Sequence, residues 1–378
     1  MQTKPNHVLN MIFHLIPHQQ NRRFAKLAAI LGLTVTTTVQ ADIYQWQYID
    51  PDNPSLGKEI SSELAPDGAG VTAEPYADLS WLDLYKGWFF GADLSNANFY
   101  GAYLNSAYFE NAVLTNVNFT DANLSGADFT NATLTGATLP YYVYGAVFTG
   151  ANLNGANLVY FYSESSDFSN ASFQNANLEN AWFFFSNVTG ADFSGANIRG
   201  GAFYFADGFT LGQLYSTASY QDKDLSFVGF YGGDFSGADF TNQNLQGAYF
   251  QNLDLTGADF TGANIKGAAF ETLDGFTSEQ LASTASFQNK DLAGIVFEEL
   301  NLSGFDFSDQ NLEGAHFIYV SLPIPTSPGR TSRVPCFKAS TDFPATSFTA
   351  PLPTRTTTSP TSSSTAPISW NSISPTRI

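Results

Sequence analysis

The sequence predicts an all-β solenoid, because a five-residue unit recurs over most of the chain. From Gly232 to Phe270 it reads GGDFS GADFT NQNLQ GAYFQ NLDLT GADFT GANIK GAAF. A Phe, Leu or Ile stands at every fifth position, usually with Asp or Asn directly before it and often with Ala two positions before it. A period of five fits neither an α-helix nor a simple alternating strand, and self-repetition of this kind is typical of a solenoid.

Each unit has the composition of one short side and one corner. Residues two apart in an extended segment share a face, so the Ala and the large apolar residue point inward and the Asp or Asn between them points outward. The other two positions hold Ser, Thr, Gly, Asn or Asp, which suit tight turns. If four sides close a coil, equivalent residues recur about every twenty positions, and stacked coils pair their backbones at about 4.8 Å.

This pattern, A(D/N)LXX, resembles the pentapeptide repeat family, and the resemblance covers Ala77 to Leu322. The resemblance implies a right-handed quadrilateral β-helix. The N-terminal segment described below makes the chain resemble an exported bacterial member. The family's members have diverse functions, so the resemblance predicts a fold and transfers no binding or catalytic residue.

The large apolar residues at the unit centres follow steps of five from Leu79 to Leu139 and from Phe148 to Phe203, with Ser163 at one centre. Between these runs the register slips by one residue at 140–145, where tyrosines stand at 141, 142 and 144. We expect a loop that protrudes at one corner. A binding role for these tyrosines is the alternative, and an accommodated slip is the favoured interpretation.

Two longer interruptions match each other and predict helical insertions at about residues 206–222 and 273–289. The first reads GFTLGQLYSTASYQDKDL from Gly208, and the second reads GFTSEQLASTASFQNKDL from Gly275. In each, the Thr of GFT and the Gln three positions later fit a helix N-cap and its reciprocal partner. A short helix is therefore expected to dock on the coil before the repeat resumes.

The segment before the repeat predicts export. Residues 1–41 contain no Asp or Glu, and a basic cluster from Arg22 to Lys26 precedes an apolar run, which is typical of a signal peptide ending at Ala41. A membrane anchor is the alternative, but the run is shorter than the roughly 20 apolar residues that span a bilayer. Met1 and Met11 both stay open as the start.

Residues 42–76 show no repeat, and we expect them to form an irregular cap over the strand edge and core end of the first coil.

At the other end, residues 323–378 are rich in Ser, Thr and Pro, which favours a disordered tail. A second hypothesis is a frameshift near residue 323. A shifted reading frame permits a third copy of the insert. The Phe of this copy would follow Phe276 at the same distance at which Phe276 follows Phe209. On that hypothesis Cys336 and the basic residues of the tail have no selected role. The nucleotide sequence tests it: an in-frame stop, or non-repeat residues throughout the shifted frame, would end the idea.

Charge and composition argue against catalysis and against nucleic acid as a partner. Residues 42–322 hold 33 acidic and 6 basic side chains, a net charge of −27, which would repel nucleic acid and anionic lipid. His316 is the only histidine of this range and is expected at an outward surface position. The sequence has one Cys, no phosphate-binding glycine motif and no nucleophile–base pair. We therefore predict no enzyme, no catalytic, cofactor-binding or metal-binding residue, and no cofactor.

Carboxylates one coil apart are expected to stack in rows. Two charges about 5 Å apart repel by roughly 0.8 kcal/mol in water, which a solenoid can absorb. A calcium ion bridging the rows is the alternative. However, an uncharged Asn ladder on the next side shows that repetition of the unit is enough to explain such rows. The expected pairs are Asp234 over Asp254, Asp239 over Asp259 and Asn244 over Asn264.

The sequence thus predicts a non-catalytic exported scaffold, structural or protein-binding, with an acidic repetitive surface. We expect an extracytoplasmic location, no stable membrane span and an unidentified protein partner in the cell envelope, with the oligomeric state open. One alternative, which the family resemblance implies, is a DNA mimic that binds a topoisomerase and would need access to the cytoplasm. The other is a cation-binding envelope protein.

Overall fold

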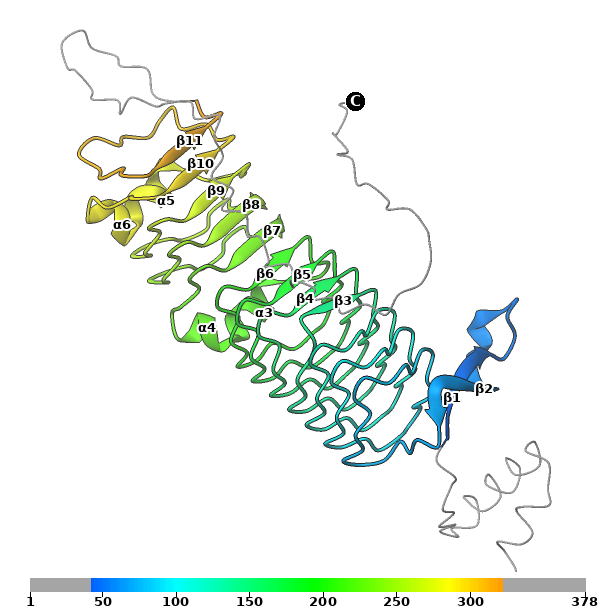
Figure 1. The fold of residues 1–378 in the computed structure, drawn as a ribbon. Helices are drawn as coiled ribbons and strands as arrows, with labels where there is room; N and C mark the ends of the chain where they lie inside the picture. Colours follow the sequence, from blue (N-terminus) through cyan, green and yellow to red (C-terminus); the bar gives the residue numbers. More distant parts are fainter. Residues whose placement is uncertain (1–41, 322–378) are drawn as a thin grey trace, which may run out of the picture. The chain divides into compact units, whose positions relative to one another are not determined.

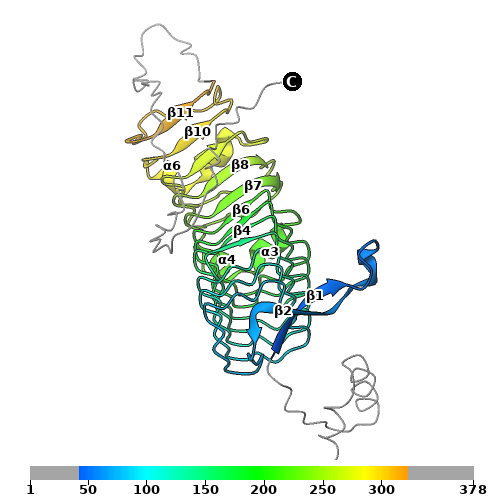
Figure 2. The ribbon, with the colours of Figure 1, turned by 45° about the vertical axis from the view of Figure 1, so that its right-hand side comes forward.

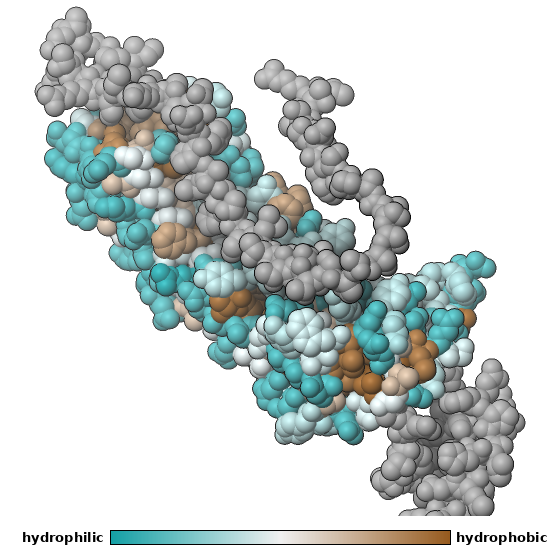
Figure 3. Space-filling view, viewed as in Figure 1, coloured by the Kyte–Doolittle hydropathy of each residue, from teal (hydrophilic) through white to brown (hydrophobic). Residues whose placement is uncertain are grey.

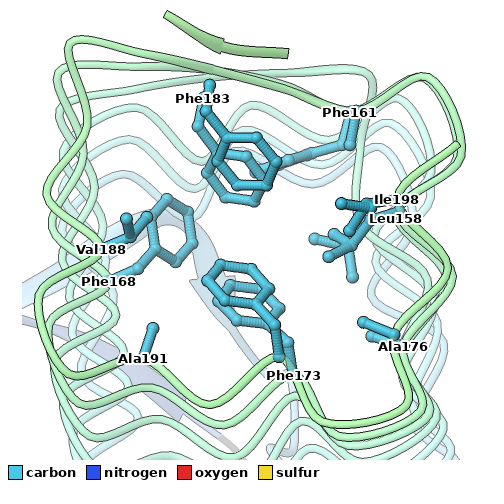
Figure 4. Close-up of a cluster of buried hydrophobic side chains, with 14 of the residues drawn as sticks. Leu158, Phe161, Phe168, Phe173, Ala176, Phe183, Val188, Ala191 and Ile198 are labelled. Atoms are coloured by element: carbon cyan, nitrogen blue, oxygen red, sulfur yellow. The ribbon is translucent and has the colours of Figure 1, made fainter. Parts of the chain in front are cut away.

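The structure is a computed structural model and describes residues 42–321. The predicted signal peptide and the C-terminal tail with its hypothetical frameshift lie outside the described residues. Over residues 77–321 the chain winds into a β-helix whose successive coils lie one on the next (Figures 1 and 2). A view along the coils shows four sides around a common interior (Figure 4). The predicted fold class, a quadrilateral β-helix with two short helical insertions, is confirmed.

Backbone pairing between equivalent residues holds the coils together. One side forms a nine-stranded parallel sheet in which β3 to β11 lie in sequence order. The other sides pair through single bridges, which confirms the predicted stacking of Asp239 on Asp259 and of Asn244 on Asn264. The strands are β3 Tyr142–Tyr144, β4 Tyr162–Glu164, β5 Trp182–Phe184, β6 Ala202–Tyr204, β7 Gly229–Asp234, β8 Tyr249–Asp254, β9 Ala269–Glu271, β10 Val296–Glu298 and β11 His316–Ile318.

The core consists of ladders of large side chains, one from each coil. The rings of Phe173 and Phe193 stack with centroids 5.0 Å apart and planes 2° from parallel. Figure 4 shows Phe168, Phe173 and Phe183 pointing inward from three different sides. Burial of one such side chain contributes on the order of 1.5–3 kcal/mol, so the repeated centres account for the cohesion of the coils.

The corners need residues that adopt a positive φ. Asn175 and Gly195 occupy equivalent corners of neighbouring coils, with φ of 57° and 70°. A Cβ on Gly195 would lie 2.4 Å from the Oδ1 atom of Asn175. Glycine and asparagine are the residues that enter this left-handed region most readily, which explains their recurrence in the repeat.

The tyrosine-rich segment at 140–145 is a strand and does not protrude as a loop, which corrects the sequence prediction. Asp128 pairs with Val147, 19 positions later, whereas most bridges join residues 20 apart. The coil therefore loses one residue and keeps its path. Val143 fills the interior position of β3 and is fully buried, so Tyr142 and Tyr144 both point outward.

Both predicted insertions are present, and each contains two short helices where one was expected. The helices are α3 Leu211–Ser216 and α4 Ala218–Gln221 in the first insert, and α5 Ser278–Ser283 and α6 Ala285–Gln288 in the second. Both predicted capping boxes form, between Thr210 and Gln213 and between Thr277 and Gln280. The second helix of each insert starts because a further threonine, Thr217 or Thr284, provides a new N-cap.

The capping glutamines also dock the inserts on the coil below. Gln213 Nε2 donates hydrogen bonds to the carbonyls of Val188 and Ala191, both at 2.9 Å. Gln280 Nε2 repeats the arrangement on the carbonyls of Leu255 and Ala258, at 2.8 and 2.9 Å. The two inserts are thus copies in three dimensions as well as in sequence.

An antiparallel hairpin occupies most of the segment for which the sequence predicted an irregular cap. It consists of β1 Asp42–Tyr48, the 3-10 turn η1 Pro54–Leu56 and β2 Lys58–Ala69. The Trp46 backbone N–H donates to the carbonyl of Lys86, and the Trp88 N–H donates to that of Tyr44, at 2.9 and 2.7 Å. The hairpin therefore covers backbone of the first coil.

Candidate interaction surface

Three sides of the β-helix carry mostly small polar residues at their outward positions, and these residues shape the corners. Oδ1 of Asp93 accepts hydrogen bonds from the backbone N–H and the hydroxyl of Ser95, at 3.1 and 2.6 Å. These bonds lower the pKa of Asp93. Along the coils, Asn118 Nδ2 donates to Oδ1 of Asn98 at 2.9 Å. The outward Asp and Asn side chains thus serve the fold itself.

The fourth side, which carries the nine-stranded sheet, presents large rings at its outward positions. We call the following set the aromatic face: Tyr142, Tyr144, Tyr162, Trp182, Phe184, Tyr204, Tyr231 and Tyr249 on strands β3–β8, with Phe185 and Phe205 at the adjoining corner. Tyr231 is a buried member of this set. The exposed fraction is 50% for Tyr144 and 54% for Phe185. Figure 3 shows hydrophobic residues gathered in separate patches within a largely polar surface.

The rings of the aromatic face stack on one another from coil to coil. The centroids of Tyr142 and Tyr162 lie 5.6 Å apart, with planes 24° from parallel. Those of Phe184 and Tyr204 lie 4.6 Å apart at 19°. Because the ring faces cover each other, the face offers ring edges and hydroxyl groups to its surroundings.

Two members of the aromatic face occupy corners where a bulky residue is unfavourable. Phe185 and Phe205 have φ of 48° and 44°, and their rings stack 5.7 Å apart. A left-handed conformation costs a residue with a side chain roughly 1–2 kcal/mol. The equivalent corners of other coils hold mostly smaller residues, such as Gly145, Ser165 and Asn252, although Trp81, Tyr160 and Phe227 show that a ring can occupy a left-handed corner on another side. The repeat does not require phenylalanine at these two corners.

Carboxylates border the aromatic face and accept hydrogen bonds from its hydroxyl groups. Tyr142 donates to Glu164 at 3.0 Å, and Tyr249 donates to the carboxylate of Glu271. Burial, followed by the charges of Glu298 and Glu299, raises the pKa of Glu271 to about 7. A cation brought to this end of the face would favour the ionised form of Glu271.

Sequence reasoning identified two members of this surface, Tyr142 and Tyr144, and interpreted them as part of a protruding loop. It missed the remaining rings because each belongs to a different unit. The signal was nevertheless present, since Tyr142, Tyr162 and Trp182 stand at equivalent positions on one side of successive coils. His316, predicted at an outward position, lies on β11 and is partly exposed.

The predicted carboxylate rows exist in the described part of the chain. Asp234 lies beside Asp254 in the register of β7 and β8. Within residues 42–321, no group of three or more His, Cys, Asp and Glu side chains comes together as metal ligands would. Over the same range, no helix has the length and apolarity to cross a membrane.

A family model describes the same repeat that the coil register shows. The model for pentapeptide repeats matches eight times, over residues that together span 77–140, 146–200 and 234–271. The chain carries pentapeptide repeats. The repeat forms the scaffold on which the aromatic face is built. No curated protein sequence matched the chain.

Several solved pentapeptide-repeat structures are similar to this chain. HetL, from the cyanobacterium Nostoc, is 20% identical over 67% of this chain and 90% of its own, with a TM-score of 0.23. A protein of the Arabidopsis thaliana thylakoid lumen is 29% identical over 34% of this chain and 75% of its own, with a TM-score of 0.20. QnrB1, a plasmid-mediated fluoroquinolone resistance protein, is 15% identical over 61% and 84%, with a TM-score of 0.18. With TM-scores this low, the fold assignment rests on the coil register and the repeat model.

Proposed function

We propose that this chain is a non-catalytic, extracytoplasmic scaffold that binds a protein partner through the aromatic face. The observation that carries the proposal is the contrast between sides of one β-helix. On three sides the repeat mostly uses Asp, Asn, Ser and Thr outward, with exposed rings at scattered positions such as Trp81, Phe90 and Phe227. On the fourth side Tyr, Trp and Phe recur outward in successive coils. Aromatic rings held on a rigid backbone are enriched in protein interfaces, where they contribute much of the binding energy.

The charge of the β-helix indicates the chemistry of the partner. The 33 acidic and 6 basic side chains of residues 42–321 attract a basic protein. At the aromatic face, Glu164 and Glu271 border the rings. The surface therefore fits a partner with an apolar centre and a basic rim.

The extracytoplasmic location is supported by the sequence of residues 1–41, where a basic cluster precedes an apolar run. Fractionation of cells that express the full chain tests this part. We expect the protein in the envelope or the medium, shortened by cleavage after Ala41. Recovery of the uncleaved chain in the cytoplasm would contradict it.

The carboxylate rows favour a second candidate function, a DNA mimic that binds a topoisomerase. Asp239 and Asp259 pair one coil apart, as do Asp234 and Asp254, giving acidic groups at regular spacing. This function requires the protein in the cytoplasm and predicts that the purified chain inhibits DNA supercoiling by a type II topoisomerase. Export without such inhibition would leave the scaffold as the supported function.

The test of the aromatic face uses three versions of the full chain as bait for envelope proteins. One is unchanged. One carries Tyr144→Thr with Phe185→Asn, which removes two exposed rings and places Asn at a left-handed corner. The third carries Phe90→Thr, which removes a ring of similar exposure, 45%, from another side.

We expect a basic protein that the unchanged chain and the Phe90→Thr variant retain and the double variant loses. Purified partner should bind the double variant at least about tenfold more weakly, as for interface residues that dominate binding. Equal retention by all three versions would contradict the proposal.

A further inference from the structure

A groove of about 540 Å³ opens beside the second insert. The helices of this insert, α5 and α6, lie near the end of the β-helix that carries β11 (Figure 1). Leu281 and Ala282 of α5 and the ring of Phe287 of α6 line one part of it. Residues 304–310 of the following coil line the other part. Phe287 is only partly buried, so an aromatic surface is available inside the groove.

The first insert shows what occupies the corresponding position in the earlier copy. There Tyr215 takes the place of Ala282 and Tyr220 the place of Phe287. The two tyrosine rings lie 4.7 Å apart. The hydroxyl of Tyr215 accepts a hydrogen bond from the backbone N–H of Asp239 at 2.8 Å, and the hydroxyl of Tyr220 donates to the Asp239 carbonyl at 2.9 Å.

The framework around the two positions is the same. Gln243 Nε2 donates to the carbonyl of Tyr220 at 3.0 Å, and Gln310 Nε2 donates to the carbonyl of Phe287 at the same distance. The hydrogen-bonded backbone is thus shared, and the lining also differs at other positions: Glu279 stands where the first insert has Gly212, and Phe305 stands where the earlier coil has Ala238. In the second insert the substitution of tyrosine by Ala282 removes a ring from above Phe287 and removes the hydroxyl that would face the backbone of Asp306, the counterpart of Asp239.

We propose that this groove binds a small phenol, whose ring occupies the place that Tyr215 fills in the first insert. The ring packs on Phe287, and the phenol oxygen accepts a hydrogen bond from the backbone N–H of Asp306. Glu279, Asp306 and Asp309 line the groove, and Lys290 there already pairs with Asp309 at 3.5 Å. The site therefore favours neutral phenols over phenolic acids. This site is independent of the aromatic face and of any protein partner.

The test measures binding of p-cresol, the side chain of tyrosine as a free molecule, to the full chain by calorimetry or ligand-observed NMR. A ligand of this size is expected to bind with a dissociation constant of about 1 mM. Toluene should bind at least several-fold more weakly, because it leaves the N–H of Asp306 without an acceptor. N-acetyltyrosinamide should also bind more weakly than p-cresol, and tighter binding would overturn the assignment to a free phenol.

Two variants locate the site. Ala282→Tyr supplies the missing ring from the chain itself and should weaken p-cresol binding at least tenfold while the melting temperature stays the same or rises. Tyr215→Ala with Tyr220→Phe gives the first insert the residues of the second at these two positions, and should add a second equivalent of bound p-cresol. Binding that Ala282→Tyr leaves unchanged, or no p-cresol binding by the unchanged chain at about 10 mM, would overturn the proposal.

Discussion

The aromatic face and the three polar sides belong to the same repeat, and they differ only at positions that point outward. Behind both, the interior is a continuous ladder of buried side chains such as Phe173 and Phe183. On the polar sides, outward Asp and Asn hold the corners through hydrogen bonds. On the aromatic face, the rings of Tyr144 and Phe185 have no comparable corner role and remain half exposed.

This difference separates what folding requires from what it permits. An inward residue contacts the coils above and below, so its size is constrained by the neighbouring coils. An outward residue is constrained only where it closes a corner. Large rings that recur outward in successive coils on one side therefore indicate a requirement outside the fold.

The largest expected effect tests the interior that both regions share. Phe173→Ala removes a fully buried ring that stacks on Phe193 and should lower the free energy of unfolding by about 3–5 kcal/mol. Denaturant unfolding of purified protein measures the change. A loss below about 1 kcal/mol would mean that the ladders do not hold the coils together.

A smaller effect is expected where an outward residue of a polar side closes a corner. Asp192 accepts hydrogen bonds from the backbone N–H and hydroxyl of Ser194 and from Gln174 Nε2, at 2.9, 2.5 and 2.6 Å. Asp192→Ala should cost about 1–2 kcal/mol, because it leaves the corner N–H without its acceptor. Asp192→Asn keeps an acceptor and is the matched control. Equal stability of the two variants would argue against the corner role.

The contributions of the two regions to folding stability should also change with pH in opposite directions. Hydrogen bonds from Ser95 lower the pKa of Asp93. The stability that Asp93 contributes is therefore complete above its ordinary pKa of 3.8, and it is lost as pH falls through the pKa of the folded state. The pKa of Glu271 is raised to about 7. The stability that Glu271 contributes is therefore complete below its ordinary pKa of 4.5, and it is lost as pH rises toward 7.

Glu271→Gln isolates the second response. Between about pH 5 and pH 8 the melting temperature of the unchanged chain should fall more than that of the variant, because the variant has no proton to lose at this position. Parallel melting curves over that range would show that Glu271 does not titrate as its surroundings indicate.

The smallest effect is expected on the aromatic face. Tyr144→Thr and Phe185→Asn should each change the free energy of unfolding by less than about 1 kcal/mol. For Phe185→Asn the lost ring contacts are offset because Asn enters the left-handed region more easily than Phe. A destabilisation as large as that of Phe173→Ala would assign the exposed rings to the fold and remove the contrast.

The repeat made the interior predictable, because the large apolar residue at the centre of each unit points inward and an equivalent residue follows in the next coil. The helical inserts were also predictable, since the threonine and glutamine of each capping box mark the start of a helix. The hairpin of residues 42–69 was not, because its strands pair with register shifts near Tyr44 and have no repeat pattern. The aromatic face required the coil register, since only stacking brings Tyr142, Tyr162 and Trp182 together.

Site-specific photocrosslinking in cells tests the central claim most directly, because it captures a partner whose identity is unknown. A photoreactive phenylalanine analogue replaces Tyr144 on the aromatic face in one strain and Phe90 on another side in a second strain. We predict a crosslinked protein of defined mass from position 144 and none of that mass from position 90. Identical products from both positions, or no product from position 144, would contradict the account.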